Sequence, residues 1–182
     1  MPVTEAAFRK LALEEPGARW ELDCGALRQK PAMTAAHNYV TSNLFGALFQ
    51  QLDRREFQVR SNAGHVRRSA QHYYIPDIFV VPMELVRPLL PQHDVLEAYE
   101  VPLPLVVEVW SQSTGDYDVD AKLPEYQRRG DLEIWRIHPY ERTLVAWRRQ
   151  PDGSYTETLY TSGVVHPIAL PGVSIDLDAL FE

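Results

Sequence analysis

Two acidic residues stand where a charged side chain requires an explanation. Glu108 lies inside the apolar run from Leu105 to Trp110, whose composition is typical of a central strand covered on both faces. An ionised carboxylate in such a strand destabilises the fold unless a partner compensates its charge. Asp77 opens another predicted strand, so we expect both carboxylates at the same end of one sheet. Paired oxygen ligands of this kind suit a hard divalent cation, Mg²⁺ or Mn²⁺.

Lys122 is the cation that could act beside these carboxylates. It lies on the helix predicted after the Glu108 strand, in a chain whose basic residues are mostly arginine and whose other lysines are Lys10 and Lys30. An ammonium group there could hold an attacking water or neutralise charge on a phosphate, while a metal polarises the phosphoryl oxygen. The residues alone leave simpler roles open: Glu108 could pair with an arginine, Asp77 could cap a turn, and Lys122 could be solvated.

The spacing of apolar residues, glycines and prolines predicts the elements that must position this group. Thr4 caps a first helix, which Pro16 and Gly17 end. A long apolar stripe predicts a helix over 34–53. A further helix is expected over 116–129, where Pro124 either introduces a kink or confines the regular part to Leu123 onward. Expected strands are 19–22, 26–29, 57–60, 64–68, 75–81, 105–110, 132–137, 143–148 and 155–160, with an irregular segment over 82–104 that carries a helical turn near 84–87.

Length and composition predict a single domain over residues 1–182, and its expected helices and strands make that domain α/β. The chain is 45% apolar and contains no apolar stretch near the roughly 20 residues that a membrane span needs. Its formal net charge of -7 argues against general nucleic-acid binding. Arginine pairs could still form a local strip that contacts phosphates, although solvated faces explain each pair equally well. These pairs are Arg54-Arg55, Arg67-Arg68, Arg128-Arg129 and Arg148-Arg149.

Cysteine and histidine usage argues against a zinc protein. Cys24 is the only cysteine, which excludes an intrachain disulfide and argues against a zinc site made of thiolates. A chain without disulfides is typical of a reducing cytoplasm. No histidines show the spacing of zinc ligands, and four of them are interpreted as surface or loop residues. These four are His65, His72, His93 and His166.

The order and spacing of several short segments resemble the bacterial Uma-type restriction endonucleases, a branch of the PD-(D/E)XK nuclease superfamily. The resemblance spans nearly the whole chain, and its segments are specific together rather than singly. The segments are Glu21-Leu22-Asp23-Cys24-Gly25-Ala26-Leu27, Ala36-His37-Asn38, Pro76-Asp77-Ile78, Leu105 to Ser111, Asp120 to Tyr126, and Pro171 to Leu177 with Phe181.

This resemblance implies a mixed β-sheet flanked by helices, with additional antiparallel hairpins, and a metal-dependent nuclease site. Asp77 and Glu108 would ligate the cation, Lys122 would be the catalytic lysine, and Glu21 would be a further acidic catalytic group. His37 is a weaker candidate. The superfamily usually places its lysine two positions after the acidic residue, where this chain has Trp110, so Lys122 would be a lysine that has migrated to the adjacent helix.

The N-terminal segment departs from the family at one position. Cys24 stands before Gly25 where the family usually has aspartate, which leaves the role implied for Glu21 less supported than that of Asp77.

The leading hypothesis is therefore a Mg²⁺- or Mn²⁺-dependent endonuclease that hydrolyses DNA with water as nucleophile. The alternative is a nuclease-like binding module that has lost turnover, for which the acidic net charge and displaced lysine leave room. Ser111 and His138 supply residue types for a Ser-His-Asp hydrolase, but the chain lacks a Gly-x-Ser-x-Gly elbow and a phosphate-binding P-loop. A homodimer is a further hypothesis, because two sites would serve to cut both strands.

Overall fold

Two mixed β-sheets form the framework of the chain, which a computed structural model describes for residues 2–182. The larger sheet has the strand order β11-β10-β9-β8-β6-β3, and its neighbours are antiparallel except for β8 and β9. Its strands are β3 (Phe57–Ser61), β6 (Ile78–Pro82), β8 (Leu105–Val109), β9 (Glu133–His138), β10 (Thr143–Arg149) and β11 (Tyr155–Tyr160).

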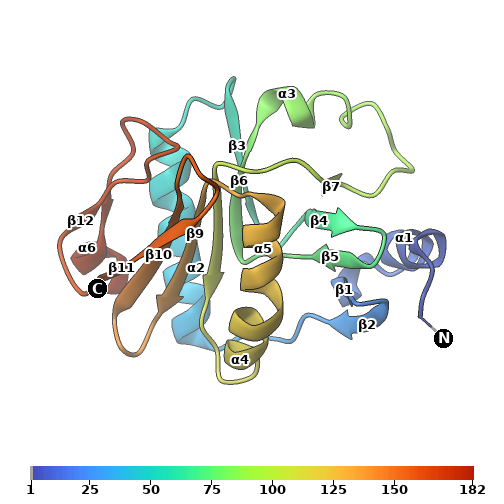
Figure 1. Cartoon of the computed structure of the whole chain (residues 1–182), viewed down its shortest axis with the longest axis horizontal. Helices are drawn as coiled ribbons and strands as arrows, with labels where there is room; N and C mark the ends of the chain where they lie inside the picture. The colour runs from blue at the N-terminus through green and yellow to red at the C-terminus, as the bar shows by residue number, and fades with distance from the viewer. Residues whose placement is uncertain (1) are drawn as a thin grey trace.

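Helices α2 (Ala35–Gln51) and α5 (Leu123–Arg129) lie on opposite sides of the larger sheet (Figure 1). Successive side chains of a strand point to opposite faces, and the side chains of β8 are divided accordingly between two apolar cores. Its odd-numbered residues belong to the core that contains Leu44 of α2, whereas Val106 belongs to the core that contains Tyr126 of α5. Glu108 shares the face of Val106, so its carboxylate lies on the α5 side of the sheet.

The smaller sheet has the strand order β2-β1-β5-β4-β7 and is built mainly from two hairpins. Helix α1 (Glu5–Glu14), capped by the Thr4 hydroxyl, buries Phe8 against Leu22 and Tyr73 of this sheet. Its strands are β1 (Trp20–Asp23), β2 (Ala26–Gln29), β4 (His65–Ser69), β5 (His72–Tyr74) and β7 (Ala98–Tyr99). The mixed sheet with flanking helices and added hairpins confirms the predicted fold class.

Two predicted elements differ from the structure. The strand predicted over 75–81 is β6, which begins only at Ile78, because the chain leaves β5 at Tyr74 and crosses between the sheets through Pro76. The helix predicted over 116–129 consists of α4 (Gly115–Tyr117), a π-helix (Asp118–Lys122) and α5. Pro124 lies in the first turn of α5, where a missing backbone N–H costs no hydrogen bond, and the regular α-helix begins at Leu123, which confirms the second of the two predicted effects of this proline.

Short elements complete the described chain. The helical turn predicted near 84–87 is present, and the closing segment packs a short helix against the core on the α2 side. These elements are a 3₁₀-helix (Pro16–Ala18), α3 (Met83–Val86), β12 (Val164–Val165), β13 (Ile175–Asp176) and α6 (Leu177–Phe181).

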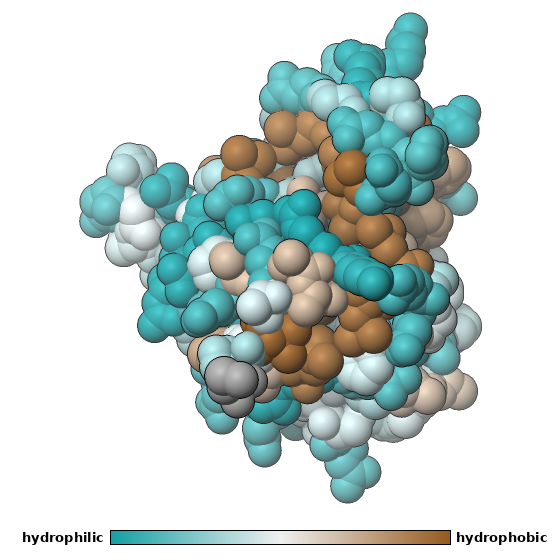
Figure 2. Space-filling model, turned by 90° about the vertical axis from the view of Figure 1, so that its right-hand side faces the viewer, coloured by the Kyte–Doolittle hydropathy of each residue, from teal (hydrophilic) through white to brown (hydrophobic). Residues whose placement is uncertain are grey.

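The surface on the side of α1 and β2 is mostly hydrophilic, with a band of apolar residues running across it (Figure 2). None of the described helices has the length and apolar character needed to cross a membrane.

Candidate active site

A cavity of about 190 Å³ is lined by residues of both sheets and of the α4–π-helix segment. Glu21, Asp77, Glu108 and Lys122, the four residues predicted for the site, all line it. Each of them is at most 4% exposed. The structure therefore brings the four predicted side chains together. The full lining is Glu21, Arg28, Gln29, Lys30, Pro31, Met33, Asp77, Glu108, Ser113, Thr114, Tyr117, Asp118 and Lys122.

The register of β6 and β8 explains why the two predicted metal ligands are neighbours. These strands are antiparallel, with Ile78 opposite Val107. Asp77, immediately before β6, and Glu108, near the end of β8, therefore lie at the same end of the sheet. The backbone N–H of Val109 donates a hydrogen bond of 2.7 Å to Asp77 Oδ2, which fixes the aspartate against β8.

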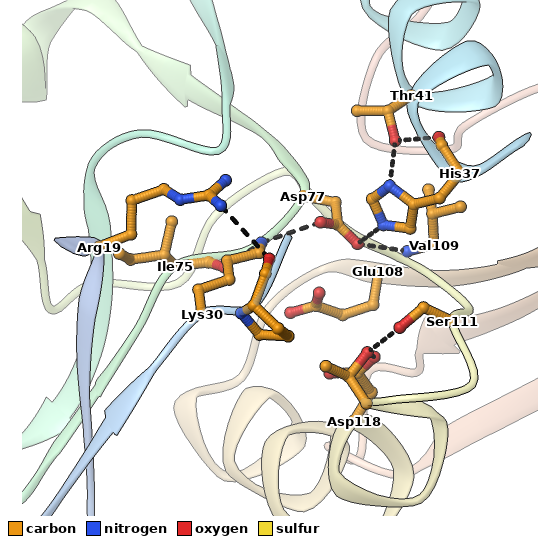
Figure 3. A network of polar contacts seen from close by, with 12 residues as sticks. Arg19, Lys30, His37, Thr41, Ile75, Asp77, Glu108, Val109, Ser111 and Asp118 are labelled. Atoms are coloured by element: carbon orange, nitrogen blue, oxygen red, sulfur yellow. Dashed lines mark hydrogen bonds and ion pairs between the residues drawn. The ribbon is translucent and has the colours of Figure 1, made fainter. Parts of the chain in front are cut away.

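Asp77 is surrounded by donors (Figure 3). Lys30 Nζ lies 2.8 Å from its Oδ1, and His37 Nε2 lies 3.1 Å from its Oδ2. Burial alone would raise the pKa of Asp77, but the Lys30 ammonium and the His37 hydrogen bond outweigh it and hold that pKa below its ordinary value. Asp77 is therefore a buried, ionised carboxylate.

For Glu108, burial outweighs the attraction of neighbouring positive charge, the reverse of Asp77. Its Oε1 accepts a 2.5 Å hydrogen bond from the Tyr126 hydroxyl and lies 3.3 Å from Lys122 Nζ. Burial raises the pKa of Glu108 to about 8, because the attraction of Lys122 is opposed by the nearby carboxylates of Asp118 and Asp77. Near neutral pH this carboxyl group holds a proton that a cation would have to displace.

Lys122 is shared among three carboxylates. Its Nζ lies 2.9 Å from Glu21 Oε1, 3.3 Å from Glu108 Oε1 and 3.6 Å from Asp118 Oδ1. Burial acts to lower the pKa of Lys122, but these carboxylates outweigh it and raise the pKa well above its ordinary value. The π-helix begins at Asp118 and ends at Lys122, and such local widenings of a helix are frequent at functional sites. The ammonium on this adjacent helix therefore reaches Glu108.

The backbone of Ile75 joins the two sheets at the site. Its N–H donates a 2.7 Å hydrogen bond to Glu21 Oε1, and its carbonyl accepts a 2.7 Å hydrogen bond from Lys30 Nζ. Glu21 and Lys30 come from the smaller sheet and its hairpin, whereas Asp77 and Glu108 come from the larger one. The site therefore depends on how the chain crosses between the sheets.

Sequence reasoning missed Lys30 and Asp118. Lys30 could have been found from the scarcity of lysine, since it is one of three in the chain and follows the hairpin that carries Glu21. Asp118 stands four positions before Lys122, a spacing that brings side chains together on one helical face.

His37, the weaker candidate, is fully buried beside Asp77 rather than in the lining of the cavity. Its Nδ1 lies 3.5 Å from the Thr41 hydroxyl, which itself donates to the His37 carbonyl. This arrangement orients the imidazole toward Asp77. Trp110, which occupies the usual lysine position of the superfamily, instead stacks on His138 with ring centroids 4.3 Å apart.

The Ser-His-Asp hypothesis has no geometric support within residues 2–182. Ser111 hydrogen-bonds to the hydroxyls of Ser113 and Thr114, and no hydrogen bond between Ser111 and His138 occurs among these residues. The interpretation of His65 and His72 as surface or loop residues is wrong, because they lie in β4 and β5 and are 6% and 9% exposed. His93 and His166 are exposed and outside helices and strands, as predicted.

Most of the arginine pairs are engaged within the protein. Arg67 pairs with Glu5, Arg68 and Arg128 both contact Glu125, and Arg148 pairs with Glu133. Arg129 is buried, pairs with Asp131 and donates to backbone carbonyls. The strip of free arginines that could contact phosphates is therefore largely absent from the described residues, because the side chains stabilise the fold.

The donor set fits a hard divalent cation. The buried charged groups that line the cavity are four carboxyls, Glu21, Asp77, Glu108 and Asp118, and only two ammonium groups. Within the described chain, Asp118 Oδ1 is buried without a hydrogen-bond donor. Burial raises the pKa of Asp118, and an added positive charge would relieve this excess of negative charge. Oxygen ligands of this type fit Mg²⁺ or Mn²⁺.

Comparison with known proteins identifies the fold and the family of this chain. A solved structure described as a putative nuclease belonging to DUF820, from Anabaena variabilis, superimposes with a TM-score of 0.79. The alignment covers 99% of this chain and 98% of that one at 19% sequence identity. The shared fold is restriction-endonuclease-like.

The family model Uma2, described as "Putative restriction endonuclease", matches residues 6–178. The chain therefore belongs to the Uma2 family, and the predicted family is confirmed. Among curated proteins no match was found.

Proposed function

We propose that this protein is a Mg²⁺- or Mn²⁺-dependent endonuclease that hydrolyses DNA phosphodiester bonds with water as the nucleophile. The observation that carries the proposal is the position of Lys122 Nζ, which lies 3.3 Å from Glu108 and 2.9 Å from Glu21 inside the cavity that Asp77 also lines. A lysine among converging carboxylates supports this chemistry, because the carboxylates can hold a cation and the ammonium can neutralise charge that develops on the phosphate.

Asp77 and Glu108 are the residues that would hold the cation. Asp77 is ionised and fixed by Lys30, so it offers a preoriented oxygen ligand. Both described hydrogen-bonding and ion-pair contacts of Glu108 involve Oε1, which leaves Oε2 available. A divalent cation bound there supplies Lewis acidity to a phosphoryl oxygen.

Lys122 would act on the reacting water, and Glu21 would position its ammonium group. Because its pKa is raised, Lys122 stays cationic and can orient a water molecule or neutralise charge that develops on the phosphate. Glu21 lies 2.9 Å from Lys122 and holds the ammonium in place. In this assignment the catalytic residues are Lys122, Asp77, Glu108 and Glu21.

The alternative function is a nuclease-like binding module without turnover. It is favoured by one observation: Lys122 is already shared among three carboxylates and must release part of these contacts to serve a substrate. The net charge of -7 also weakens any general attraction for DNA.

Cleavage of DNA by the purified chain tests the proposal. Supercoiled plasmid and single-stranded DNA are incubated with Mg²⁺, Mn²⁺ or EDTA, and the wild type is compared with Asp77→Asn and Lys122→Met. We expect metal-dependent cutting that both substitutions reduce by about 10²-fold or more, in line with the loss of one preorganised electrostatic group.

Lys10→Met is the matched control, because Lys10 has a side chain that is 74% exposed and lies on α1. Cutting that persists in EDTA, or that survives in both site variants, would contradict the nuclease assignment. Mn²⁺ binding by calorimetry without cutting of either DNA would instead support the binding module.

Two further proposals concern the whole protein. We infer that residues 1–182 act as a single domain in a reducing cytoplasm, and that two copies associate to cut both strands of duplex DNA. A monomeric mass by light scattering, measured at the protein concentration that cuts plasmid, would exclude the dimer.

A further inference from the structure

A second group of metal-ligand side chains lies outside the candidate active site, at the turn between β1 and β2. One ligand atom from each of Asp23, Cys24 and His72 lies within 4.8 Å of the other two. Among residues 2–182 this is the one group of three histidine, cysteine or acidic side chains with such a spacing. Cys24 Sγ and His72 Nε2 are 3.4 Å apart. Zinc bonds of about 2.0–2.3 Å in a tetrahedral site separate ligand atoms by roughly 3.3–3.8 Å, so this pair already has a metal-binding separation.

The backbone holds the turns of the two hairpins that carry these ligands against each other. The N–H of Gly25 donates a 3.2 Å hydrogen bond to the carbonyl of Gln71, which links the β1–β2 turn to the β4–β5 turn. Cys24 adopts a left-handed conformation with φ 49°, which is uncommon for a residue other than glycine. The two hairpins lie side by side on the same side of the molecule (Figure 1). The ligands therefore come from two hairpins whose turns are already in contact: Asp23 ends β1, Cys24 lies in the β1–β2 turn and His72 begins β5.

Neighbouring groups also orient the ligands. The Ser69 hydroxyl lies 2.8 Å from His72 Nδ1, which leaves His72 Nε2 to face Cys24. The Tyr74 hydroxyl donates a 2.9 Å hydrogen bond to Asp23 Oδ1. Hydrogen bonds to the ligating side chains commonly fix the orientation of metal-binding histidines and carboxylates.

The ligand set indicates a transition metal rather than Mg²⁺. Thiolate, imidazole and carboxylate together suit Zn²⁺, whereas Mg²⁺ prefers oxygen ligands alone. Cys24 is exposed, so a metal can reach the group from solvent and a water can take a fourth position. Desolvation and the Asp23 carboxylate raise the pKa of the Cys24 thiol, which argues against a free thiolate nucleophile beside His72.

We propose that Asp23, Cys24 and His72 form a Zn²⁺ site that fastens the β1–β2 turn to the β4–β5 hairpin. On binding, the sulfur–hydrogen bond of Cys24 breaks, its proton passes to solvent, and a zinc–sulfur bond forms without any change in oxidation state. Glu21 precedes Asp23 by two positions in β1, so both point to the same face of the strand. The zinc ion would therefore hold in place the strand that delivers Glu21 to the cavity.

This site does not depend on the proposed nuclease activity and can be tested without it. The metal-free full-length chain is titrated with Co²⁺, and the thiolate-to-cobalt charge-transfer absorption is recorded. Because Cys24 is the only cysteine, this absorption has a single source. We expect one equivalent of cobalt to produce the band, Cys24→Ser to abolish it, and His72→Ala to reduce it at least tenfold at the same Co²⁺ concentration.

Two controls separate this site from the carboxylate cavity and from incidental histidine binding. Asp77→Asn removes a carboxylate of the cavity and His93→Ala removes an exposed histidine, and both should retain the full band. A titration without the band, or a band of equal strength in a folded His72→Ala variant, would overturn the proposal.

A thermal measurement decides the case even if His72→Ala fails to fold. Zn²⁺ at about 100 times its dissociation constant should raise the melting temperature of the wild type by about 5–10 °C. Cys24→Ser changes one atom in an exposed turn and should abolish most of this shift. An equal shift in wild type and Cys24→Ser would refute the zinc site.

Discussion

Replacing Glu108 by glutamine should stabilise the metal-free protein, although Glu108 is proposed as a metal ligand. The residue is 4% exposed, and burial raises the pKa of its side chain from 4.5 to about 8. Below the unfolded-state pKa, both the folded and the unfolded chain hold the proton, and the free energy of unfolding is unaffected. As the pH rises from the unfolded-state pKa toward the folded-state pKa, only the unfolded chain releases the proton, which lowers the free energy of unfolding. The wild type should therefore become less stable between pH 4.5 and pH 8.

The magnitude follows from the size of the shift. Between pH 4.5 and pH 7 the unfolded chain releases the Glu108 proton while the folded chain keeps it, at about 1.4 kcal/mol for each pH unit. The loss is therefore about 3 kcal/mol at pH 7. Glutamine has nearly the same shape and does not ionise, so Glu108→Gln avoids this loss and can still accept the Tyr126 hydrogen bond.

Thermal and urea unfolding in EDTA at pH 4.5, 7 and 8 measures the effect. We expect nearly equal stability at pH 4.5 and a melting temperature about 6–12 °C higher for the variant at pH 7, with the gap widening at pH 8. Glu84→Gln, at an exposed position, is the matched control and should show no such gap. A gap that is absent, or that stays constant with pH, would refute this account of Glu108.

Three further predictions concern the same site. The affinity for Mn²⁺ should rise by up to about tenfold per pH unit from pH 6 to pH 8, because the cation displaces the Glu108 proton. Calorimetry in two buffers should detect the released proton, and an affinity independent of pH would contradict this prediction. Lys30→Met should cost about 3–5 kcal/mol in urea unfolding, because it leaves the Asp77 carboxylate buried without its ammonium partner, whereas Lys10→Met should cost less than about 0.5 kcal/mol. Lys122→Arg should lose most of the DNA cleavage while keeping Mn²⁺ binding, because the larger guanidinium cannot take the place of an ammonium shared among three carboxylates. Equal DNA cleavage by Lys122→Arg and the wild type would show that only the charge of the side chain matters.

The sequence predicts the larger sheet well, because its signals are local. The apolar residues on both sides of Glu108 identify β8. The four-residue apolar spacing predicts a helix over 34–53, close to the observed bounds of α2, Ala35–Gln51. The two carboxylates and Lys122 stand out because each is a charged group next to an element that must be buried. These three were accessible from residue type and place alone.

Other parts of the site depend on contacts between distant segments. Asp118 looks like an ordinary acidic residue near a helix start, and its contact with Lys122 gains meaning only because Lys122 also reaches Glu21 and Glu108 from other segments. Cys24 and His72 are 48 positions apart, so no ligand spacing within the sequence relates them. Their approach depends on the pairing of two hairpins, which hydrophobic periodicity does not specify.

The backbone contacts of Ile75 make the alignment of the two sheets tolerant of mutation. Because the links to Glu21 and Lys30 use the main-chain N–H and carbonyl of residue 75, any substitution that keeps an amide proton also keeps both donors and acceptors. Valine or leucine, which would satisfy the 3% exposed position, should leave the alignment intact. Proline alone among the twenty residues removes the N–H. Residue 75 can therefore change among apolar side chains during evolution while the geometry of the cavity stays the same.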